Sequence, residues 1–390
     1  MNQALSKRDI STRLLVPGII LISFCLRPTL TSVGPLIPMI REDLSLSNGL
    51  AGFLTTLPLI AFATFSLFAS GIGARLGNVR AILLGLILLG IGTVIRVQGG
   101  SFLLFAGTAL TGVGIVICNV LIIPLIKLKL PNKIGIMTSV YTTGMSGFAA
   151  VGTGLSVPIA MELGWRGSLL SWIGLIVIAI LLWIPQVKTK KVKGADEGLS
   201  GGKNVWKSRL AWEVSLFMGI QSTMFYTLIA WLPDLLIYRG FTAGSAGLVM
   251  SLMQVVGLVG SFLAPLVAVK YASQVRIAVG MGLIYFVGYT TLFSSNELIL
   301  YTGLTLIGFC LGASISLAYT LIGLRTEGGT TARLSGMAQS AGYYLAALGP
   351  VMVGILFDWN KNWNILIIMM IICALSFAYL GSRVGRNVKV

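Results

Sequence analysis

Charged residues are scarce in this chain. Of its 390 residues only 10% are Asp, Glu, Lys or Arg, while 56% are hydrophobic. A soluble domain of this length carries far more charge on its surface, so the composition excludes that class. Apolar stretches of about 18 residues or more recur along the sequence, and this pattern is typical of a polytopic helical membrane protein.

Histidine is absent and cysteine is rare. The chain therefore lacks the commonest metal ligand and the commonest proton relay. The four cysteines fall in separate apolar stretches, without metal-ligand or disulfide spacing: Cys25, Cys118, Cys310 and Cys373. No Gly-x-x-x-x-Gly-Lys-Ser/Thr loop occurs either, which argues against ATP-driven pumping. We expect no metal and no cofactor, and a membrane-embedded enzyme or receptor is disfavoured.

Acidic residues number 11 against 28 basic ones, for a net charge of +17. In a soluble protein this excess would suggest nucleic acid, but in a membrane protein it reflects the positive-inside rule. We therefore expect no nucleic-acid partner. No acid falls deep in an apolar stretch, since the nearest ones lie at span ends: Glu162, Asp234, Glu297 and Asp358. Facilitated transport or exchange is favoured over conventional proton coupling, which would need Glu213, Asp234 or a tyrosine to serve.

Twelve apolar segments predict twelve transmembrane helices. They cover approximately 14–40, 49–74, 81–95, 101–126, 134–160, 167–186, 214–233, 244–269, 277–294, 298–324, 334–357 and 363–382. Lys and Arg concentrate in alternate connections and in both tails. The opposite connections hold only Arg41, Arg96, Arg166, Arg239 and Lys361. This asymmetry predicts cytoplasmic termini in a multi-pass protein of a bacterial-type inner membrane.

A long basic connection divides the chain into two sets of six spans. Residues 187–213 are rich in Lys and Gly, as in a flexible cytoplasmic linker. We therefore expect six-helix bundles at 1–186 and 214–390. The two halves also repeat, since the spacing from Pro38 to Gly52 recurs from Pro233 to Gly247. At the offset that aligns these prolines, Arg27 pairs with Ser222, as expected for a duplicated transporter fold.

The connection between the second and third spans carries a recognisable motif. Its sequence, Ser70-Gly-Ile-Gly-Ala-Arg-Leu-Gly-Asn-Val-Arg80, resembles the signature of the major facilitator superfamily. Ala74 stands where an acid is usual, so a gate salt bridge from that acid is not expected. Arg75, Gly77 and Arg80 remain as the gating motif that this resemblance implies.

Several stretches resemble more narrowly the cyanate and 2-nitroimidazole transporter family (CynX/NimT). They are Arg27-Pro28-Thr29 with Val33-Gly34-Pro35-Leu36, Leu54 to Pro58, Gly164-Trp165-Arg166, Gln221 to Pro233, and Ser335 to Pro350. This resemblance implies a twelve-helix secondary transporter of small molecules that works by alternating access. Members of the family handle different solutes, so the substrate stays open.

Arg27 is the principal candidate for binding substrate. It is the only charged residue in the middle of a predicted span, where a charge costs about 3 kcal/mol on insertion scales. A guanidinium suits a carboxylate, cyanate or nitro group. Pro28, Pro35 and Pro38 should bend this span or open its hydrogen-bond ladder. The alternative is a structural role, in which Arg27 binds carbonyls that Pro28 exposes.

Other polar residues fall deep in spans and complete the predicted site: Thr31, Asn119, Tyr141, Gln221, Ser222, Tyr226, Gln254, Tyr319, Gln339 and Tyr343. Each could equally bond a neighbouring helix or pack as an aromatic. The sequence thus predicts a secondary carrier of a small anionic or electron-rich solute, acting as a monomer in the bilayer. A multidrug or nitroheterocycle exporter is the alternative, and nothing separates import from export.

Overall fold

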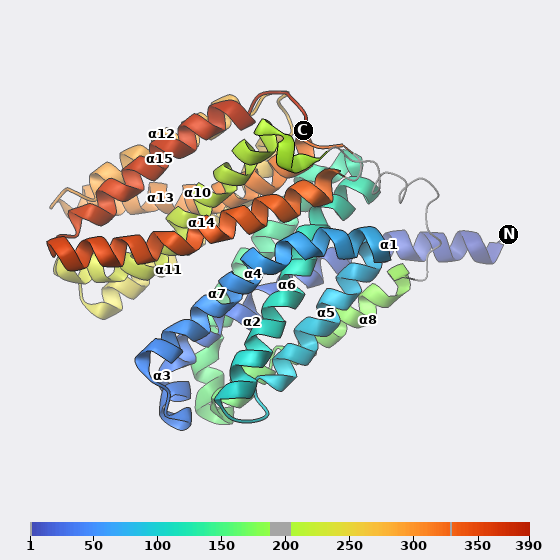
Figure 1. Ribbon diagram of the computed structural model, residues 1–390, viewed down its shortest axis with the longest axis horizontal. Coiled ribbons are helices and arrows are strands. Elements are labelled where there is room, and N and C mark those ends of the chain that lie inside the picture. The colour runs from blue at the N-terminus through green and yellow to red at the C-terminus, as the bar shows by residue number, and fades with distance from the viewer. Residues whose placement is uncertain (1, 188–203, 328–329) are drawn as a thin grey trace. The chain divides into compact units, whose positions relative to one another are not determined.

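Figure 1 shows the computed structural model, which describes residues 2–187, 204–327 and 330–390. Over these residues the chain is helical, without a strand. In the first half the helices are α1 Asn2–Leu26, α2 Pro28–Thr31, α3 Val33–Leu44, α4 Asn48–Leu76, α5 Asn78–Ile95, α6 Ser101–Lys129, α7 Ile134–Leu170 and α8 Ile173–Val187. In the second half they are α10 Arg209–Tyr238, α11 Ala243–Ala268, α12 Val275–Thr291, α13 Glu297–Leu324, α14 Thr330–Asn360 and α15 Asn364–Val384.

Every predicted span falls on a helix. Ten stretches of the described chain are long and apolar enough to cross a membrane, and one of them, Pro131–Val187, contains two predicted spans. The remaining span is the shorter α12. The all-helical, multi-pass class is therefore confirmed. Residues 188–203, most of the predicted linker, lie outside the described residues, and after them a short 3-10 helix at Val205–Lys207 precedes α10.

Two interruptions of the helices bear on the sequence prediction. The first span is three helices rather than one, because α1 stops at Leu26 and a second break falls at Ser32. Pro28 begins α2, where its missing N–H costs nothing, so the predicted disruption at Pro28 is confirmed. The predicted connection between the fifth and sixth spans is confirmed, because Gly164, with a non-helical φ of 69°, separates two helical parts within α7.

The described residues pack into two compact units. Of the described residues, one unit contains 2–132, 144–187 and 330–336, and the other contains 133–143, 204–327 and 337–390. The first turns of α7 thus belong with the second half of the chain, and the first turns of α14 belong with the first half. Within the first unit α4 packs on α6, α5 on α8 and α1 on α8. The corresponding pairs in the second unit are α11–α13, α12–α15 and α10–α15, so both units repeat one packing order.

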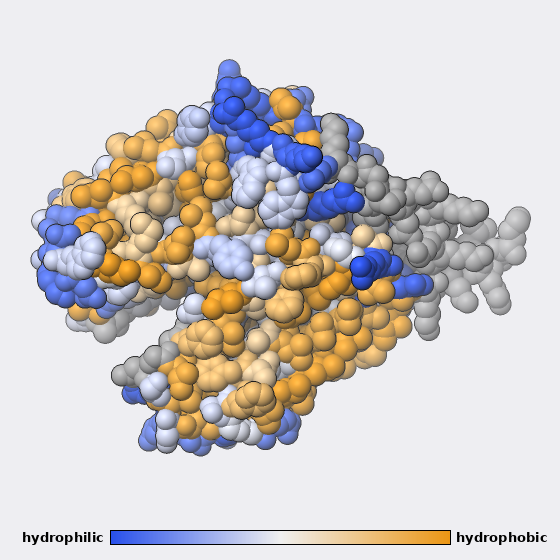
Figure 2. Space-filling view, viewed as in Figure 1, coloured by the Kyte–Doolittle hydropathy of each residue, from blue (hydrophilic) through white to orange (hydrophobic). Residues whose placement is uncertain are grey.

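On the face that Figure 2 shows, hydrophobic residues cover much of the surface along the helices. On α5 the exposed apolar residues are Ile87, Ile91 and Val94, and on α15 they are Ile368, Ile372 and Leu375. Spacings of three and four residues place each set on one helix face. An apolar stripe that faces outward rather than toward a core is what contact with lipid requires.

Candidate functional site

Arg27 occupies the break between α1 and α2. It stands just before α2, and its carbonyl accepts the N–H groups of Leu30 at 3.0 Å and Thr31 at 2.9 Å. Pro28 has no N–H to donate to the preceding turn, so the helix cannot continue unchanged through this point. The Arg27 side chain is half-buried. A cation at a break in a membrane helix is thus partly open to the surroundings.

Helix α7 holds this broken segment along a seam of small residues. A β-carbon on Gly152 would lie 2.7 Å from Pro28 Cα, and one on Gly144 would lie 3.0 Å from Phe24 Cε1. The Phe24 and Phe148 rings stack with centroids 3.9 Å apart. Thr31 Oγ1 donates to the carbonyl of Ala149 at 2.9 Å. The predicted site residue Thr31 therefore ties the break to α7.

Sequence reasoning missed the residue that binds the other side of the break. Arg96, which follows α5, was placed with the charges of an outer connection, yet its side chain is fully buried. Its Nη1 donates to the carbonyl of Thr29 at 2.6 Å, and its Nη2 donates to the carbonyl of Leu169 at 3.2 Å. Only four residues, 97–100, separate Arg96 from α6. This short connection is the one feature of the sequence that could have indicated that Arg96 packs between helices.

The Gly164-Trp165-Arg166 motif forms a clamp at the end of α3. The bend at Gly164 uses a positive φ that suits glycine. Trp165 Nε1 donates to Asp43 Oδ2 at 3.1 Å, and Arg166 Nη1 donates to the same oxygen at 2.7 Å. The hydrogen bond from Arg166, followed by that from Trp165, lowers the pKa of the Asp43 carboxyl.

In the second unit, α10 and α14 form a seam like that between the first span and α7. The α-carbon of Gly342 lies close to Gly219, where an added β-carbon would stand 3.2 Å away. Farther along, Trp231 Nε1 donates to the carbonyl of Pro350 at 2.8 Å. Close glycine contacts of this kind let membrane helices approach each other and bring their polar side chains together.

This seam carries two groups of predicted site residues. Gln221 Nε2 donates to Ser222 Oγ at 2.6 Å, and both side chains are buried on α10. The rings of Tyr226 and Tyr343 lie 6.4 Å apart at an interplanar angle of 60°. The structure thus brings Gln221 to Ser222 and Tyr226 to Tyr343.

A further aromatic pair lies where the first turns of α7 meet α13 in the second unit. Tyr141 and Tyr319 are fully buried, and their rings meet edge to face with centroids 6.4 Å apart. Beside them Ser316 Oγ donates to Thr142 Oγ1 at 2.8 Å, and it shares a 2.7 Å hydrogen bond with Ser261 Oγ. Hydroxyl groups therefore cross three helices at this point.

Three further predicted site residues lie on α6, α14 and α11. Asn119 on α6 and Gln339 on α14 are buried, whereas Gln254 on α11 is exposed. A part in substrate binding stays a prediction for each of the three. In the motif between the second and third spans, Gly77 joins α4 to α5 with φ 84°, and Arg75 and Arg80 are exposed. A side chain at Gly77 would be strained by this backbone conformation.

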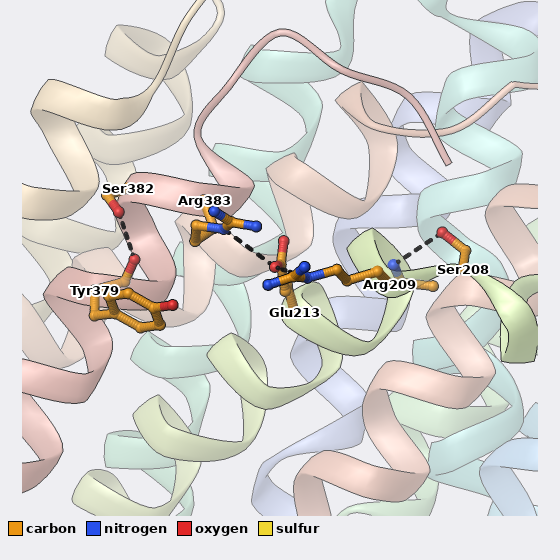
Figure 3. Close-up of polar contacts among 7 residues, drawn as sticks. Ser208, Arg209, Glu213, Tyr379, Ser382 and Arg383 are labelled. Atoms are coloured by element: carbon orange, nitrogen blue, oxygen red, sulfur yellow. Dashed lines mark hydrogen bonds and ion pairs between the residues drawn. The ribbon is translucent and has the colours of Figure 1, made fainter.

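Glu213, a candidate for proton coupling, lies near the start of α10 (Figure 3). Its Oε1 accepts from Arg209 Nε and Arg383 Nε, both at 3.2 Å. Arg209 is on the same helix and Arg383 is on α15, so the carboxylate ties these two helices together. Over the described residues, no three His, Cys, Asp or Glu side chains lie together in a way that could hold a metal ion.

These observations define a class of protein: a helical membrane protein of two units that repeat one packing order, with polar groups on a broken span and on the span that repeats it. The family model of the Major Facilitator Superfamily matches residues 19–350. The chain belongs to that superfamily, whose members are transporters rather than enzymes.

Named relatives agree with this assignment. The chain is 45% identical to the uncharacterized transporter YycB of Bacillus subtilis, with 96% of this chain and 94% of the relative covered. It is 37% identical to the 2-nitroimidazole transporter of Escherichia coli, with 96% of each covered. It is 25% identical to the cyanate transport protein CynX of the same organism, with 88% and 90% covered. The crystal structure of the transporter FucP has the same fold, with a TM-score of 0.77, 14% identity and coverage of 96% and 99%.

Proposed function

We propose that this protein is a secondary transporter of a small anionic or electron-rich solute, with Arg27 as the anchor for that solute. The substrate class comprises cyanate-like anions, small carboxylates and nitro compounds. Transport proceeds by alternating access in a bacterial-type inner membrane, with both termini in the cytoplasm. The observation that carries the proposal is the half-buried guanidinium at a helix break inside the first membrane span.

The chemistry of the break supports an anionic partner. A guanidinium presents several N–H donors in one plane, which matches the paired oxygens of a carboxylate or nitro group. In a medium of low dielectric constant, such charge-assisted bonds are stronger than in water. A charged residue within a membrane span is retained at a cost and therefore points to a binding role. The positions Arg27 and Thr31 are four residues apart, so they share one side of this segment.

The second unit supplies further groups in this proposal. Gln221 and Ser222 can donate and accept hydrogen bonds, while the rings of Tyr226 and Tyr343 offer apolar faces. Flat aromatic solutes are held by such rings, and amides fix their orientation. The proposed set also includes Asn119, Tyr141, Gln254, Tyr319 and Gln339.

The positions of the acidic residues bear on whether transport is coupled to protons. The acidic side chains lie at span ends or in connections, and Glu213 is held by two arginines. We therefore favour facilitated transport, exchange, or entry of an anion together with its own proton. A counterflow experiment in proteoliposomes tests this, because an exchanger accelerates labelled uptake when unlabelled solute is loaded inside.

Ligand-induced thermal stabilisation of the purified protein tests the anchor. The panel contains cyanate, nitrate, short carboxylates and 2-nitroimidazole, each measured on the native protein, Arg27→Ala and Arg27→Lys. Arg239→Gln serves as a control, since Arg239 also binds a carbonyl, that of Ser294, but in the second unit. We expect one class of solute to raise the melting temperature of the native and control proteins and not of Arg27→Ala. An equal rise in Arg27→Ala would refute the anchor role.

A second candidate function is export of nitroheterocycles or of several drugs. It is favoured by the 37% identity to the Escherichia coli protein named as a 2-nitroimidazole transporter. In this case Arg27 polarises the nitro group while the tyrosines provide most of the affinity. Cells that express the protein should resist 2-nitroimidazole if it exports the compound and become sensitised if it imports the compound. If expression leaves the minimum inhibitory concentration of 2-nitroimidazole unchanged, this compound is not a substrate.

A further inference from the structure

We infer that Arg96 is a positioning residue for substrate binding, because it fixes the helix break that presents Arg27. The effect on transport rests on the proposed role of Arg27, but the effect on the break does not. Arg96 touches no proposed substrate group. It acts through the backbone, by holding the carbonyl of Thr29 two residues beyond Arg27.

The hydrogen bonds of Arg96 are directed at places where the helices are interrupted. Thr29 lies in α2, a helix of only four residues, so its carbonyl belongs to a helix end and needs a partner from elsewhere. Leu169 lies at the end of α7, one residue before that helix stops. One guanidinium thus connects the interrupted first span to the junction of α7 and α8.

Arg96 lies in apolar surroundings, where its charge must be hydrogen-bonded. Val97, Leu104 and Leu169 belong to one buried hydrophobic cluster, and Arg96 itself has no exposed surface. Among the described residues its Nε finds no acceptor, whereas both terminal nitrogens do. Burying a charge is unfavourable unless it is well bonded, so an apolar side chain would satisfy simple packing better. The cation is explained by the carbonyls that it holds.

The backbone of Arg96 is also held in place, by contacts with α6 and with the end of α5. A β-carbon on Gly107 of α6 would lie 2.7 Å from Arg96 Cα, so α6 presses directly against it. The Arg96 N–H also donates to the carbonyl of Gly92 at 3.1 Å, at the end of α5. Because the base of the side chain cannot shift, the position of its guanidinium determines where the Thr29 carbonyl lies.

Thiol labelling at position 27 tests the inference without any substrate. The background has its four cysteines replaced by Ser, and Arg27→Cys supplies one thiol for a small water-soluble reagent. We expect Arg96→Gln to change the labelling rate of this thiol about fivefold or more, and Arg96→Lys to change it less. Gly107→Ala displaces Arg96 without removing it and should give the same change, which covers the case in which Arg96→Gln fails to fold.

Two controls separate local positioning from general damage. Arg239→Gln removes an arginine–carbonyl bond in the second unit and should leave the rate at position 27 unchanged. A thiol placed by Ser251→Cys, at an exposed position of α11 in the second unit, should react at the same rate whether position 96 is Arg or Gln. An unchanged rate at position 27 in folded Arg96→Gln would overturn the inference, as would an equal change at positions 27 and 251.

A transport assay then connects the break to binding. With Arg27 in place, Arg96→Gln should raise KM about tenfold and change kcat less. This is the loss expected if the displaced Arg27 forms one hydrogen bond fewer with the solute. A fall in kcat at unchanged KM would contradict positioning. If Arg27→Ala leaves binding intact, the anchor proposal fails while the labelling result still decides the role of Arg96. If Arg27→Ala abolishes binding and Arg96→Gln changes neither labelling nor KM, only the present inference fails.

Discussion

Gly152 lies against Pro28 with no room for a side chain. A β-carbon on Gly152 would stand 2.7 Å from Pro28 Cα and 2.9 Å from Pro28 Cβ. These are backbone and ring atoms, which cannot rotate away. The shape of the break that carries Arg27 therefore depends on a glycine of α7 far away in the sequence.

The first prediction concerns this contact. Gly152→Ala should destabilise the protein by about 1–3 kcal/mol, as overpacking does, and should reduce transport. Gly154→Ala is a matched control on the same helix, because nothing lies within 4 Å of its added β-carbon. It should leave transport unchanged and stability equal or slightly higher, since Ala favours helix over Gly. Thermal unfolding and transport of both variants check this, and an inactive Gly154→Ala would contradict the contact argument.

The second prediction concerns the link between α10 and α15. Glu213→Gln removes both ion pairs, of which the one to Arg209 is 79% exposed on the arginine side and contributes little. The pair to Arg383 is less exposed. We expect a loss of about 1 kcal/mol or less in stability, with proton dependence of transport unchanged. A double-mutant cycle of Glu213→Gln with Arg383→Gln measures the pair. Loss of a proton-driven uptake in Glu213→Gln would instead identify this carboxylate as the coupling group.

Much of the fold could be predicted because lipid imposes a simple rule. Every backbone group in the membrane must be bonded within its own segment, so long apolar runs become helices. Helix α6, for example, is predominantly apolar from Phe102 to Ile126, and this pattern alone predicts a membrane span. The break at Pro28 was predictable for the same reason, since proline removes a donor. The interruption at Gly164 was also predictable, because a glycine adopts the positive φ that a connection needs. The exact place of the second break in the first span, at Ser32, was not, because that residue is neither a proline nor a glycine.

The candidate site was predictable only as a set of residue types. The sequence predicts that Tyr226 and Tyr343 lie deep in their spans. It does not predict that their rings lie against each other. Arg96 was missed because its burial depends on the α6 backbone at Gly107 and on a carbonyl of α7. Such contacts join segments far apart in the chain, and no local pattern encodes them.

The third prediction concerns the pH dependence of the clamp at Asp43. The pKa of this carboxyl is lowered in the folded protein by hydrogen bonds from Arg166 and Trp165. A lowered pKa means that the stabilisation is complete above the ordinary value near 3.8 and is lost as the pH falls through the folded-state value. The difference in melting temperature between the native protein and Asp43→Asn should therefore be constant from about pH 5 to 8 and shrink below about pH 4.

A pH series of thermal unfolding in detergent checks the clamp. Glu42→Gln is the matched control, because it removes an exposed carboxylate next to Asp43 in α3. Trp165→Phe removes one of the two donors and should reproduce part of the Asp43→Asn effect at neutral pH. A difference that grows as the solution becomes acidic would show that protonated Asp43 is the stabilising form, against the assigned sign.

The last prediction separates the two candidate functions through Tyr343. If the aromatic pair provides affinity for a nitroheterocycle, Tyr343→Ala should weaken 2-nitroimidazole binding about fivefold to tenfold, the usual worth of an aromatic contact. Tyr343→Phe keeps the ring beside Tyr226 and should bind nearly as well. For cyanate or a short carboxylate, Arg27→Ala should have the larger effect and Tyr343→Ala a small one, because these ions offer no ring to stack. Equilibrium binding of both ligands to the three variants gives the comparison. Equal losses for both ligands in Tyr343→Ala would mean that the tyrosine supports the seam between α10 and α14 rather than choosing the solute.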